Sequence, residues 1–343
     1  MQKKQRVTNA FSHRESDIIP YSVDFTILEK EKLDRYFGDP SFEKGIGNHI
    51  HCAEWTPEQT EVPGNPGHFR DFFGVVWNKS GPDKDIGVVD TPLIRNPDMG
   101  EYAFPRVDYD ALDRFYRQQL EENNDKFIIS SFGFSLFERA WTLRGMENLL
   151  SDMVLEPDFT HALFEAICSF NLNVINFSLE YPFDGIYFGD DWGQQRGLIM
   201  GPALWREYIK PYLKRMYAPC KEKGRFIAQH SCGDIHEIFP DVIDIGLDCY
   251  NTFQPEIYDI GQIKKEYGRD LSFWGAISTQ TLLPFATPEK VRSETARIME
   301  ILGKDGGYVA APTHAVPYDV PCENVEAMLD VFRNQDKYLG VKA

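Results

Sequence analysis

The sequence has too little cysteine, too sparsely placed, for a disulfide-stabilised scaffold. Its 343 residues include 6 cysteines, and no Cys-x-x-Cys pair occurs among them. So few cysteines in a chain of this length are ordinary usage for a reducing compartment. A ribbon or finger zinc site is excluded for the same reason. Any chemistry that uses a cysteine must therefore take its partners from distant parts of the chain.

Long hydrophobic runs and positive charge are also scarce. No segment approaches the about 18 apolar residues of a spanning helix, and the basic first residues are not followed by the apolar stretch of a signal peptide. The chain has 36 Lys and Arg against 53 Asp and Glu, a net charge of −17. Nucleic acids and anionic membranes both attract basic proteins. We therefore expect a cytoplasmic protein with neither of these partners.

From residue 126 onward the sequence shows a regular alternation of short apolar runs and helical segments. Strands buried on both faces of a parallel sheet have such near-continuous apolar sequences. The six predicted strands cover residues 126–132, 184–188, 225–229, 248–253, 271–274 and 307–311. Residues 1–125 are irregular and rich in turns and aromatics, with predicted strands at 72–77 and around 86–89 and a helix over 109–123.

Two α/β architectures fit this alternation, an open doubly wound sheet and a closed (β/α)8 TIM barrel. The open sheet predicts a glycine-rich phosphate loop after an early strand, and no such motif is present. The barrel predicts polar residues after most strands, because its site is built from all the carboxyl ends. Several predicted strands do end in polar residues. We predict one TIM barrel domain over residues 1–343, whose irregular N-terminal part supplies the two missing strands.

The strongest chemical signal is His230 and Cys232, at the end of one predicted strand. Residues i and i+2 of a strand point to the same side, so both face the mouth of the barrel. His314 follows another strand and reaches the same rim. One thiolate and two imidazoles predict a three-ligand zinc site with an open fourth position. The alternative is a small buried cysteine beside hydrogen-bonded histidines, and Cys322 is a weaker candidate ligand.

Two adjacent carboxylates, Asp190 and Asp191, follow the strand at 184–188. At a barrel mouth they would contact a substrate or orient a metal-bound histidine. The alternative is that one of them caps the next helix, or that they are solvated. Tyr187 and Gln254 are candidate substrate contacts that could equally serve local structure.

Three charged residues, Glu138, Arg139 and Arg144, follow the first regular strand. They would meet an anionic group or form internal ion pairs. The sequence does not separate these alternatives.

Several motifs together resemble the uroporphyrinogen decarboxylase superfamily. They are Phe188-Gly-Asp-Asp-Trp-Gly-Gln-Gln195, Gly201-Pro-Ala-Leu-Trp-Arg-Glu-Tyr-Ile-Lys-Pro211, His230-Ser-Cys-Gly-Asp234, Ala310-Ala-Pro-Thr-His314 and Pro321-Cys-Glu-Asn-Val325. The resemblance covers about residues 125–340 and extends loosely into the first third. It implies a TIM barrel.

The superfamily contains two chemistries. True decarboxylases have an arginine-containing N-terminal signature, and the first 60 residues here contain no comparable segment. The other branch comprises corrinoid-dependent methyltransferases, several of which bind zinc through His-x-Cys and a later cysteine. His230 and Cys232 match the first two ligands, and His314 stands in the setting of the third. The His-x-Cys pair therefore points to methyl transfer.

The resemblance implies a zinc-dependent methyltransferase. It would move a methyl group between a small methylated ether, alcohol or amine, or a thiol, and a corrinoid (cobalamin) on a partner protein. The implied zinc ligands are His230, Cys232 and His314, with Asp190 and His314 in catalysis. The implied substrate contacts are Asp191, Tyr187 and Gln254. The alternatives are a metal-free decarboxylase or lyase, with Asp190 and His314 moving protons, and a degenerate non-catalytic barrel. A homodimer is compatible with either enzyme.

Overall fold

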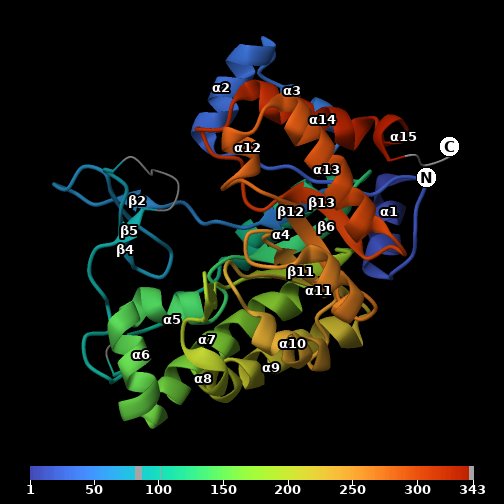
Figure 1. Cartoon of the computed structure of the whole chain (residues 1–343). Coiled ribbons are helices and arrows are strands. Elements are labelled where there is room, and N and C mark those ends of the chain that lie inside the picture. The colour runs from blue at the N-terminus through green and yellow to red at the C-terminus, as the bar shows by residue number, and fades with distance from the viewer. Residues whose placement is uncertain (82–86, 101, 340–343) are drawn as a thin grey trace.

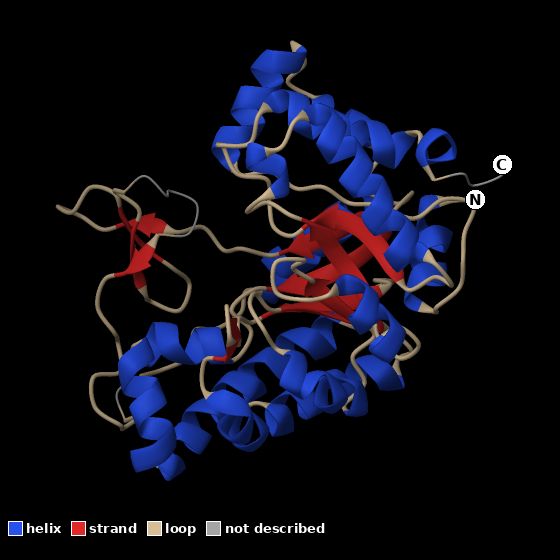
Figure 2. Ribbon diagram, in the orientation of Figure 1, coloured by secondary structure: helices blue, strands red, loops and turns tan. Residues whose placement is uncertain are grey.

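The structure, a computed structural model, describes residues 1–81, 87–100 and 102–339. Within these residues, seven parallel strands form one curled sheet surrounded by helices (Figures 1 and 2). In sheet order the strands are β1 (Ile50–Glu54), β6 (Phe127–Phe132), β7 (Gly185–Gly189), β10 (Phe226–His230), β11 (Cys249–Thr252), β12 (Ser272–Ile277) and β13 (Tyr308–Pro312). The six strands predicted from residue 126 onward are confirmed.

An extended segment around Tyr21 closes the sheet into a barrel. On one side, the Ser22 amide donates to the Ala310 carbonyl of β13 at 3.0 Å. On the other side, the His49 amide, just before β1, donates to the Tyr21 carbonyl at 2.9 Å. The segment therefore joins the last strand to the first. The predicted TIM barrel is confirmed, with two of its strand positions in the irregular first third.

The predicted strands at 72–77 and 86–89 do not belong to the barrel. A separate antiparallel sheet of β2 (Thr60–Glu61), β3 (His68–Arg70), β4 (Val76–Asn78) and β5 (Val88–Val89) lies beside the barrel (Figure 1). Most of 72–77 is a turn, because Asp71 Oδ1 accepts from the amides of Phe73 and Val75, both at 2.9 Å. Residue 86 lies outside the described residues.

Helices cover the outside of the barrel (Figure 2). Those of the first 125 residues are α1 (Lys3–Phe11), α2 (Ile27–Phe37), α3 (Phe42–Ile46) and α4 (Tyr109–Glu122). Those of the regular part are α5 (Phe137–Arg144), α6 (Met146–Leu155), α7 (Pro157–Ser178), α8 (Gly201–Tyr208), α9 (Lys210–Glu222), η1 (His236–Ile238), α10 (Phe239–Asp244), α11 (Ile260–Tyr267), α12 (Leu282–Phe285), α13 (Pro288–Gly303), α14 (Cys322–Arg333) and α15 (Gln335–Tyr338). No helix among the described residues is long and apolar enough to cross a membrane.

Two of the predicted helical regions are subdivided. The region between residues 138 and 179 forms three helices, because Gly145 adopts a φ of +86° and Pro157 begins a new helix. The region from 202 to 223 forms two helices that meet at Ile209, with Pro211 in the first turn of the second. The helix predicted over 109–123 is confirmed as α4.

Helix α1 covers the amino-terminal end of the barrel. The Phe11 ring lies 5.4 Å from the ring of Phe127 and 5.6 Å from that of Phe226, the first residues of β6 and β10. Val7 and Ala10 are buried in the same cluster. The carboxyl-terminal end is therefore the side on which a site can form, as in other barrels of this type.

The junction that closes the barrel contains a buried histidine. His49 is 1% exposed. Its Nε2 lies 3.2 Å from Arg6 Nη1, and its Nδ1 lies 3.4 Å from the Tyr21 amide nitrogen. A protonated ring would direct an N–H at each of these donors. Burial first, and then the Arg6 charge, lower the pKa of His49 to about 4.

We expect this histidine to make stability depend on pH. Because its folded-state pKa is below that of the unfolded chain, the unfolded state takes up a proton first. The free energy of unfolding should therefore fall as pH decreases from about 6.5 to about 4, by about 3 kcal/mol from this group. Urea unfolding of His49→Gln should show a weaker pH dependence over this range. His68→Gln, at a half-exposed position on the small sheet, serves as the control, and equal slopes for all three proteins would contradict the assignment.

Candidate active site at the carboxyl end of the barrel

Three candidate metal ligands meet at the ends of two neighbouring strands. His230 is the last residue of β10, and its Nε2 lies 3.6 Å from Cys232 Sγ. Asp191, two residues beyond β7, places Oδ1 3.5 Å from the same Nε2. Among the described residues, these three form the one group of histidine, cysteine and carboxylate side chains whose ligand atoms all lie within 4.8 Å of one another. We call them the Asp191–His230–Cys232 cluster.

Two glycines allow the loops that carry these residues to touch. A Cβ atom on Gly233 would lie 2.2 Å from the carbonyl carbon of Gly193, and the Gly233 φ of +79° also favours glycine. The Cys232 amide donates to Asp191 Oδ1 at 2.7 Å across this contact. The close approach of the two loops thus brings Asp191 to Cys232.

The strand register fixes the orientation of His230. Asn251 of β11 pairs with His230 in the sheet, and its Oδ1 accepts from His230 Nδ1 at 2.7 Å. Tyr187 donates to the same oxygen at 2.8 Å, while Asn251 Nδ2 donates to the Trp274 carbonyl at 3.0 Å. Because the amide oxygen only accepts, Nδ1 carries the proton. The Nε2 lone pair is therefore directed towards Cys232 and Asp191, as in metal-binding histidines.

His314 lies next to the cluster without belonging to it. Its ring centroid is 5.9 Å from that of His230, at an angle of 77°. Reduced hydration in the barrel mouth and the neighbouring His230 lower the pKa of His314, and Asp191 opposes them. The structure thus brings together two of the three predicted ligands and adds Asp191. Ligation by His314 stays a prediction.

Asp190 is fully buried beneath the cluster. The backbone amides of Leu136, Phe137 and Glu138 donate to its carboxylate at 3.3, 2.9 and 2.7 Å, and Trp192 Nε1 donates at 2.6 Å. Burial raises its pKa to about 6, while these donors oppose the shift. Asp190 therefore caps helix α5 and anchors the loop that bears Asp191. Its catalytic role stays a prediction, to which this geometry lends no direct support.

Negative charge gathers around the Cys232 thiol. Glu138 lies beside the Asp191 backbone amide, and burial together with Asp191 and Asp190 raises its pKa. Burial, Asp191 and Glu138 in turn raise the pKa of Cys232. Within the described part of the chain, no lysine or arginine forms an ion pair with Asp191 or Glu138. A cation at this place would offset the repulsion among these groups.

The remaining candidates support neighbouring backbone or side chains. Tyr187 contacts Asn251, and its Oη lies 3.1 Å from His230 Nδ1. Gln254 is buried, and its Oε1 accepts from the Gly233 amide at 2.8 Å. Substrate contacts by Tyr187 and Gln254 stay predictions. Cys322, at the start of α14, is not part of the cluster.

The two arginines form internal ion pairs. Arg139 Nη1 lies 3.1 Å from Asp71 Oδ2, and Arg144 Nε lies 2.6 Å from Asp152 Oδ2. The predicted alternative of internal ion pairs is thereby confirmed for Arg139 and Arg144.

The sequence interpretation missed Asn251 and gave Glu138 no role at the cluster. The alternation of residues along β11 would have directed Asn251 towards the interior, but only the register with β10 places it opposite His230. The only indication in the sequence that Glu138 belongs to the site is its position after a strand, where site residues of such barrels commonly lie.

The sequence comparison identifies the family. Residues 109–335 match uroporphyrinogen decarboxylase (URO-D). The chain belongs to the uroporphyrinogen decarboxylase family. It is 25% identical over 285 residues to the uroporphyrinogen decarboxylase of Chlorobaculum parvum, a match that covers 78% of each chain. It is 24% identical over 191 residues to the methylated-thiol–coenzyme M methyltransferase of Methanosarcina mazei, covering 56% of this chain and 49% of that protein.

The structural comparison bears on the fold of this family member. A methyltransferase from Methanosarcina mazei superimposes with a TM-score of 0.75 at 17% sequence identity, covering 98% of this chain and 99% of the other. The likeness therefore extends through the irregular first third. The family predicted from the motifs is confirmed, and its relatives include both a decarboxylase and a methyltransferase.

Proposed function

We propose that the protein is a zinc-dependent methyltransferase of the uroporphyrinogen decarboxylase family. It would move a methyl group between a small methylated compound or a thiol and a corrinoid carried by a partner protein. The observation that carries this proposal is the Asp191–His230–Cys232 cluster, in which the ligand atoms lie within 4.8 Å of one another. The corrinoid and its partner protein rest on the family resemblance alone, and the cytoplasmic location and homodimer remain predictions.

The ligand types of the cluster, and the distances from His230 Nε2 to the other two ligand atoms, fit zinc. Nitrogen, sulfur and carboxylate oxygen are its usual protein ligands, bound at about 2.0–2.3 Å in a tetrahedron, so neighbouring ligand atoms lie roughly 3.4–3.6 Å apart. His230 Nε2 lies 3.6 Å from Cys232 Sγ and 3.5 Å from Asp191 Oδ1. Three protein ligands leave a fourth position for substrate, as catalytic sites do.

Each residue then has a defined task. Zinc, when bound, supplies a Lewis acid that lowers the pKa of a substrate thiol or polarises an ether oxygen. Asn251 keeps the proton on His230 Nδ1, and Asp190 holds the loop of Asp191 in place. His314 is exposed at the opening, and its lowered pKa leaves a neutral ring nitrogen able to accept a proton from an incoming thiol.

Decarboxylation is the second candidate, because the decarboxylase of Chlorobaculum parvum matches 78% of this chain and the methyltransferase 56%. In that reaction Asp190 and His314 would move protons without a metal. Four N–H donors already surround the buried Asp190 carboxylate, which disfavours this role. A non-catalytic barrel is the third possibility, and it predicts that loss of cluster residues has no functional effect.

Metal removal tests the proposal. We expect the purified protein to contain about one zinc ion per chain by mass spectrometry. A chelator should abolish methyl transfer from methylcobalamin to a thiol, and added zinc should restore it. In this assay the thiolate takes the methyl group from Co(III) and leaves Co(I), which is followed by its absorption. A metal-free protein that decarboxylates a porphyrinogen in the presence of chelator would overturn the proposal in favour of the second candidate.

A further inference from the structure

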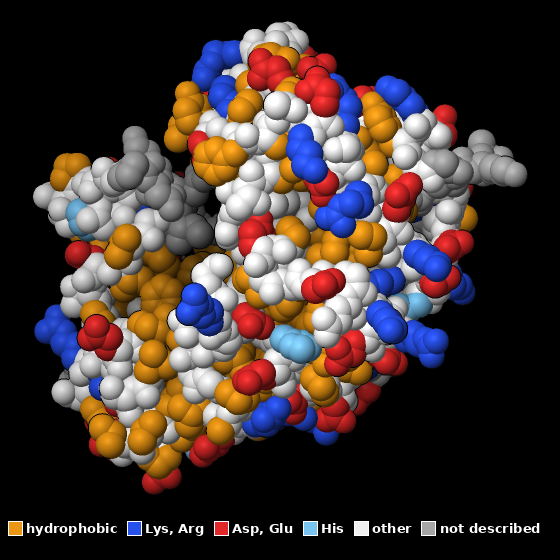
Figure 3. All heavy atoms as spheres, viewed as in Figure 1, with side chains coloured by type: hydrophobic (Ala, Val, Ile, Leu, Met, Phe, Trp, Pro, Cys, Tyr) orange, Lys and Arg blue, Asp and Glu red, His pale blue; other side chains and the backbone are white. Residues whose placement is uncertain are grey.

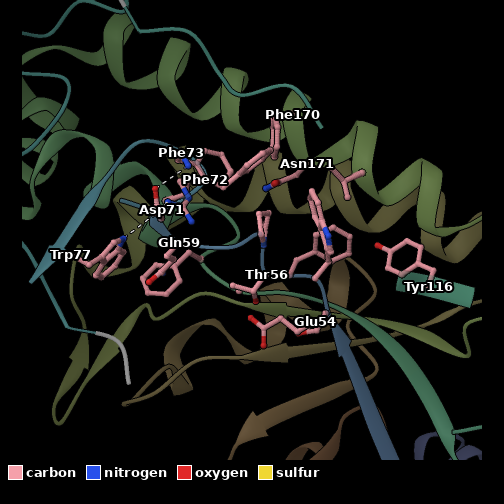
Figure 4. Close-up of a pocket in the computed structure, with 18 of the residues that line it drawn as sticks. Glu54, Thr56, Gln59, Asp71, Phe72, Phe73, Trp77, Tyr116, Phe170 and Asn171 are labelled. Atoms are coloured by element: carbon pink, nitrogen blue, oxygen red, sulfur yellow. Dashed lines mark hydrogen bonds and ion pairs between the residues drawn. The ribbon is translucent and has the colours of Figure 1, made fainter. Parts of the chain in front are cut away.

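A cavity of about 310 Å³ lies between the barrel, helix α7 and the small sheet (Figure 4). Glu54 borders it at the end of β1, and Phe170 of α7 borders it from the opposite side (Figure 4). Hydrophobic side chains gather below the small sheet on the molecular surface (Figure 3). This volume is at the lower end of the range of small-molecule sites. We call it the Glu54 cavity.

Aromatic rings form much of the wall of the Glu54 cavity. The rings come from the segment after β1, the turn of the small sheet, the end of β6 and helix α7: Trp55, Phe72, Phe73, Phe132, Phe134 and Phe170. The Phe73 and Phe170 ring centroids lie 5.1 Å apart, and those of Trp55 and Phe72 lie 5.6 Å apart. Several ring faces around one small volume are typical of sites for organic cations.

The charged groups of the cavity leave one carboxylate without a partner. Among the described residues, Glu54 has neither a hydrogen-bond donor nor a cationic partner. Asp71, in contrast, pairs with Arg139 at 3.1 Å. Lys79 also lines the cavity, and its ammonium lies 5.9 Å from the ring of Phe69, a residue outside the cavity. Glu54 is exposed to solvent at the edge of the cavity, and the reduced hydration on its cavity side raises its pKa. A cation in the cavity would stabilise its charged form.

The Glu54 cavity adjoins the Asp191–His230–Cys232 cluster. Gly133 lines the cavity, and a Cβ atom there would lie 3.0 Å from Glu54 Oε1. A Cβ atom on Gly189 would lie 3.4 Å from Gly133 Cα, and Asp191 follows two residues later. Glycines therefore separate the cavity from the cluster, so a ligand in the cavity would lie close to the candidate metal ligands.

We propose that the Glu54 cavity binds a small methylated organic cation, of the quaternary ammonium class, with Glu54 as its counter-ion and the aromatic rings around its methyl groups. This rests on the proposed function and names the class of methylated compound that the site accepts. Arg139 also lines the cavity, but its guanidinium pairs with Asp71 and lies 3.8 Å from the centre of the Phe73 ring, so it is already engaged. Choline is a small quaternary ammonium and is therefore a suitable probe.

Choline and 3,3-dimethylbutan-1-ol have nearly the same shape and differ in charge. We expect the full-length protein to bind choline at least about 10-fold more tightly than the neutral alcohol, because cation–π contacts with the rings and the charge of Glu54 favour the cation. The fluorescence of Trp55 and Trp77, which line the cavity, reports binding. Equal affinities, no binding of either probe, or tighter binding of a neutral aryl methyl ether such as anisole would overturn the proposal.

Matched variants identify the counter-ion. Glu54→Gln should reduce the preference for choline to within about threefold, and Phe72→Leu should weaken choline binding about fivefold. Glu58→Gln removes the same charge from an exposed position on the same segment, outside the cavity, and should keep the wild-type ratio. A wild-type ratio in a folded Glu54→Gln protein would overturn the role of Glu54. Binding is measured without methyl transfer and should survive chelation, so a failure here is distinguishable from a failure of the zinc-dependent function.

Discussion

Replacement of His230 by alanine is expected to remove zinc and to lower the rate of methyl transfer at least about a thousandfold. The variant loses the Nε2 atom that lies 3.6 Å from Cys232 Sγ and 3.5 Å from Asp191 Oδ1. The two remaining ligands do not define a closed coordination shell, and the thiol stays beside two carboxylates that disfavour its ionised form. Metal content and the methylcobalamin assay measure the two losses independently.

Parallel variants distinguish the two possible third ligands. If Asp191 completes the cluster, Asp191→Ala should lose zinc, whereas His314→Ala should retain it. The reverse result would support the ligand set that the sequence predicted. Cys322→Ala removes a cysteine outside the cluster and should match the wild type. A His230→Ala protein with full zinc content and full activity would contradict the cluster as the active site.

The part of the site that could be predicted is the part carried by one strand end. His230 ends β10 and Cys232 follows two residues beyond it, so the sequence already places these two ligands close together, whatever the neighbouring strands do. The third ligand could not be inferred in this way. It depends on the backbone contact between Gly193 and Gly233, where a Cβ atom on Gly233 would lie 2.2 Å from the backbone of the other loop. Such contacts are properties of two loops, and neither loop sequence reveals its partner.

The fold shows the same division between local and non-local information. The six apolar runs after residue 126 predicted their strands because both faces of each strand are buried. Strand β1 has the sequence Ile-His-Cys-Ala-Glu, and because two of these residues are polar or charged it does not form an apolar run. The segment around Tyr21 takes the eighth position through a few hydrogen bonds to β13 and to His49, with no strand pattern of its own. Closure of the barrel could therefore be predicted only from the polar strand ends, the lack of a glycine-rich phosphate loop and the family resemblance.

The second large effect, on the stability of the fold, is expected at the ion pair between Arg144 and Asp152. This pair makes no hydrogen bond or ion pair with the residues of the Asp191–His230–Cys232 cluster. Arg144 Nε donates to Asp152 Oδ2 at 2.6 Å, and both side chains are 7% exposed. Arg144 Nη1 also donates to the carbonyls of Ile94 and Arg95, at 3.2 and 2.7 Å. One guanidinium thus joins α5, α6 and the connection that leads from the small sheet to α4.

Arg144→Met is expected to lower the free energy of unfolding by about 3–5 kcal/mol. Methionine retains much of the apolar volume but leaves the Asp152 carboxylate buried without a partner. The carbonyls of Ile94 and Arg95 lose their donor as well. Urea unfolding followed by circular dichroism and tryptophan fluorescence measures the loss.

Two comparisons separate the buried charge from other effects of the substitution. Arg215 also pairs with a carboxylate, that of Glu165, but the two side chains are 44% and 48% exposed. Arg215→Met should therefore cost less than about 1 kcal/mol, because water screens exposed pairs. The double variant Arg144→Met/Asp152→Leu leaves no unpaired buried charge and should recover most of the stability, with about 1–2 kcal/mol still lost at the two carbonyl groups. If Arg144→Met costs no more than Arg215→Met, this pair does not hold the two helices and the connecting segment together.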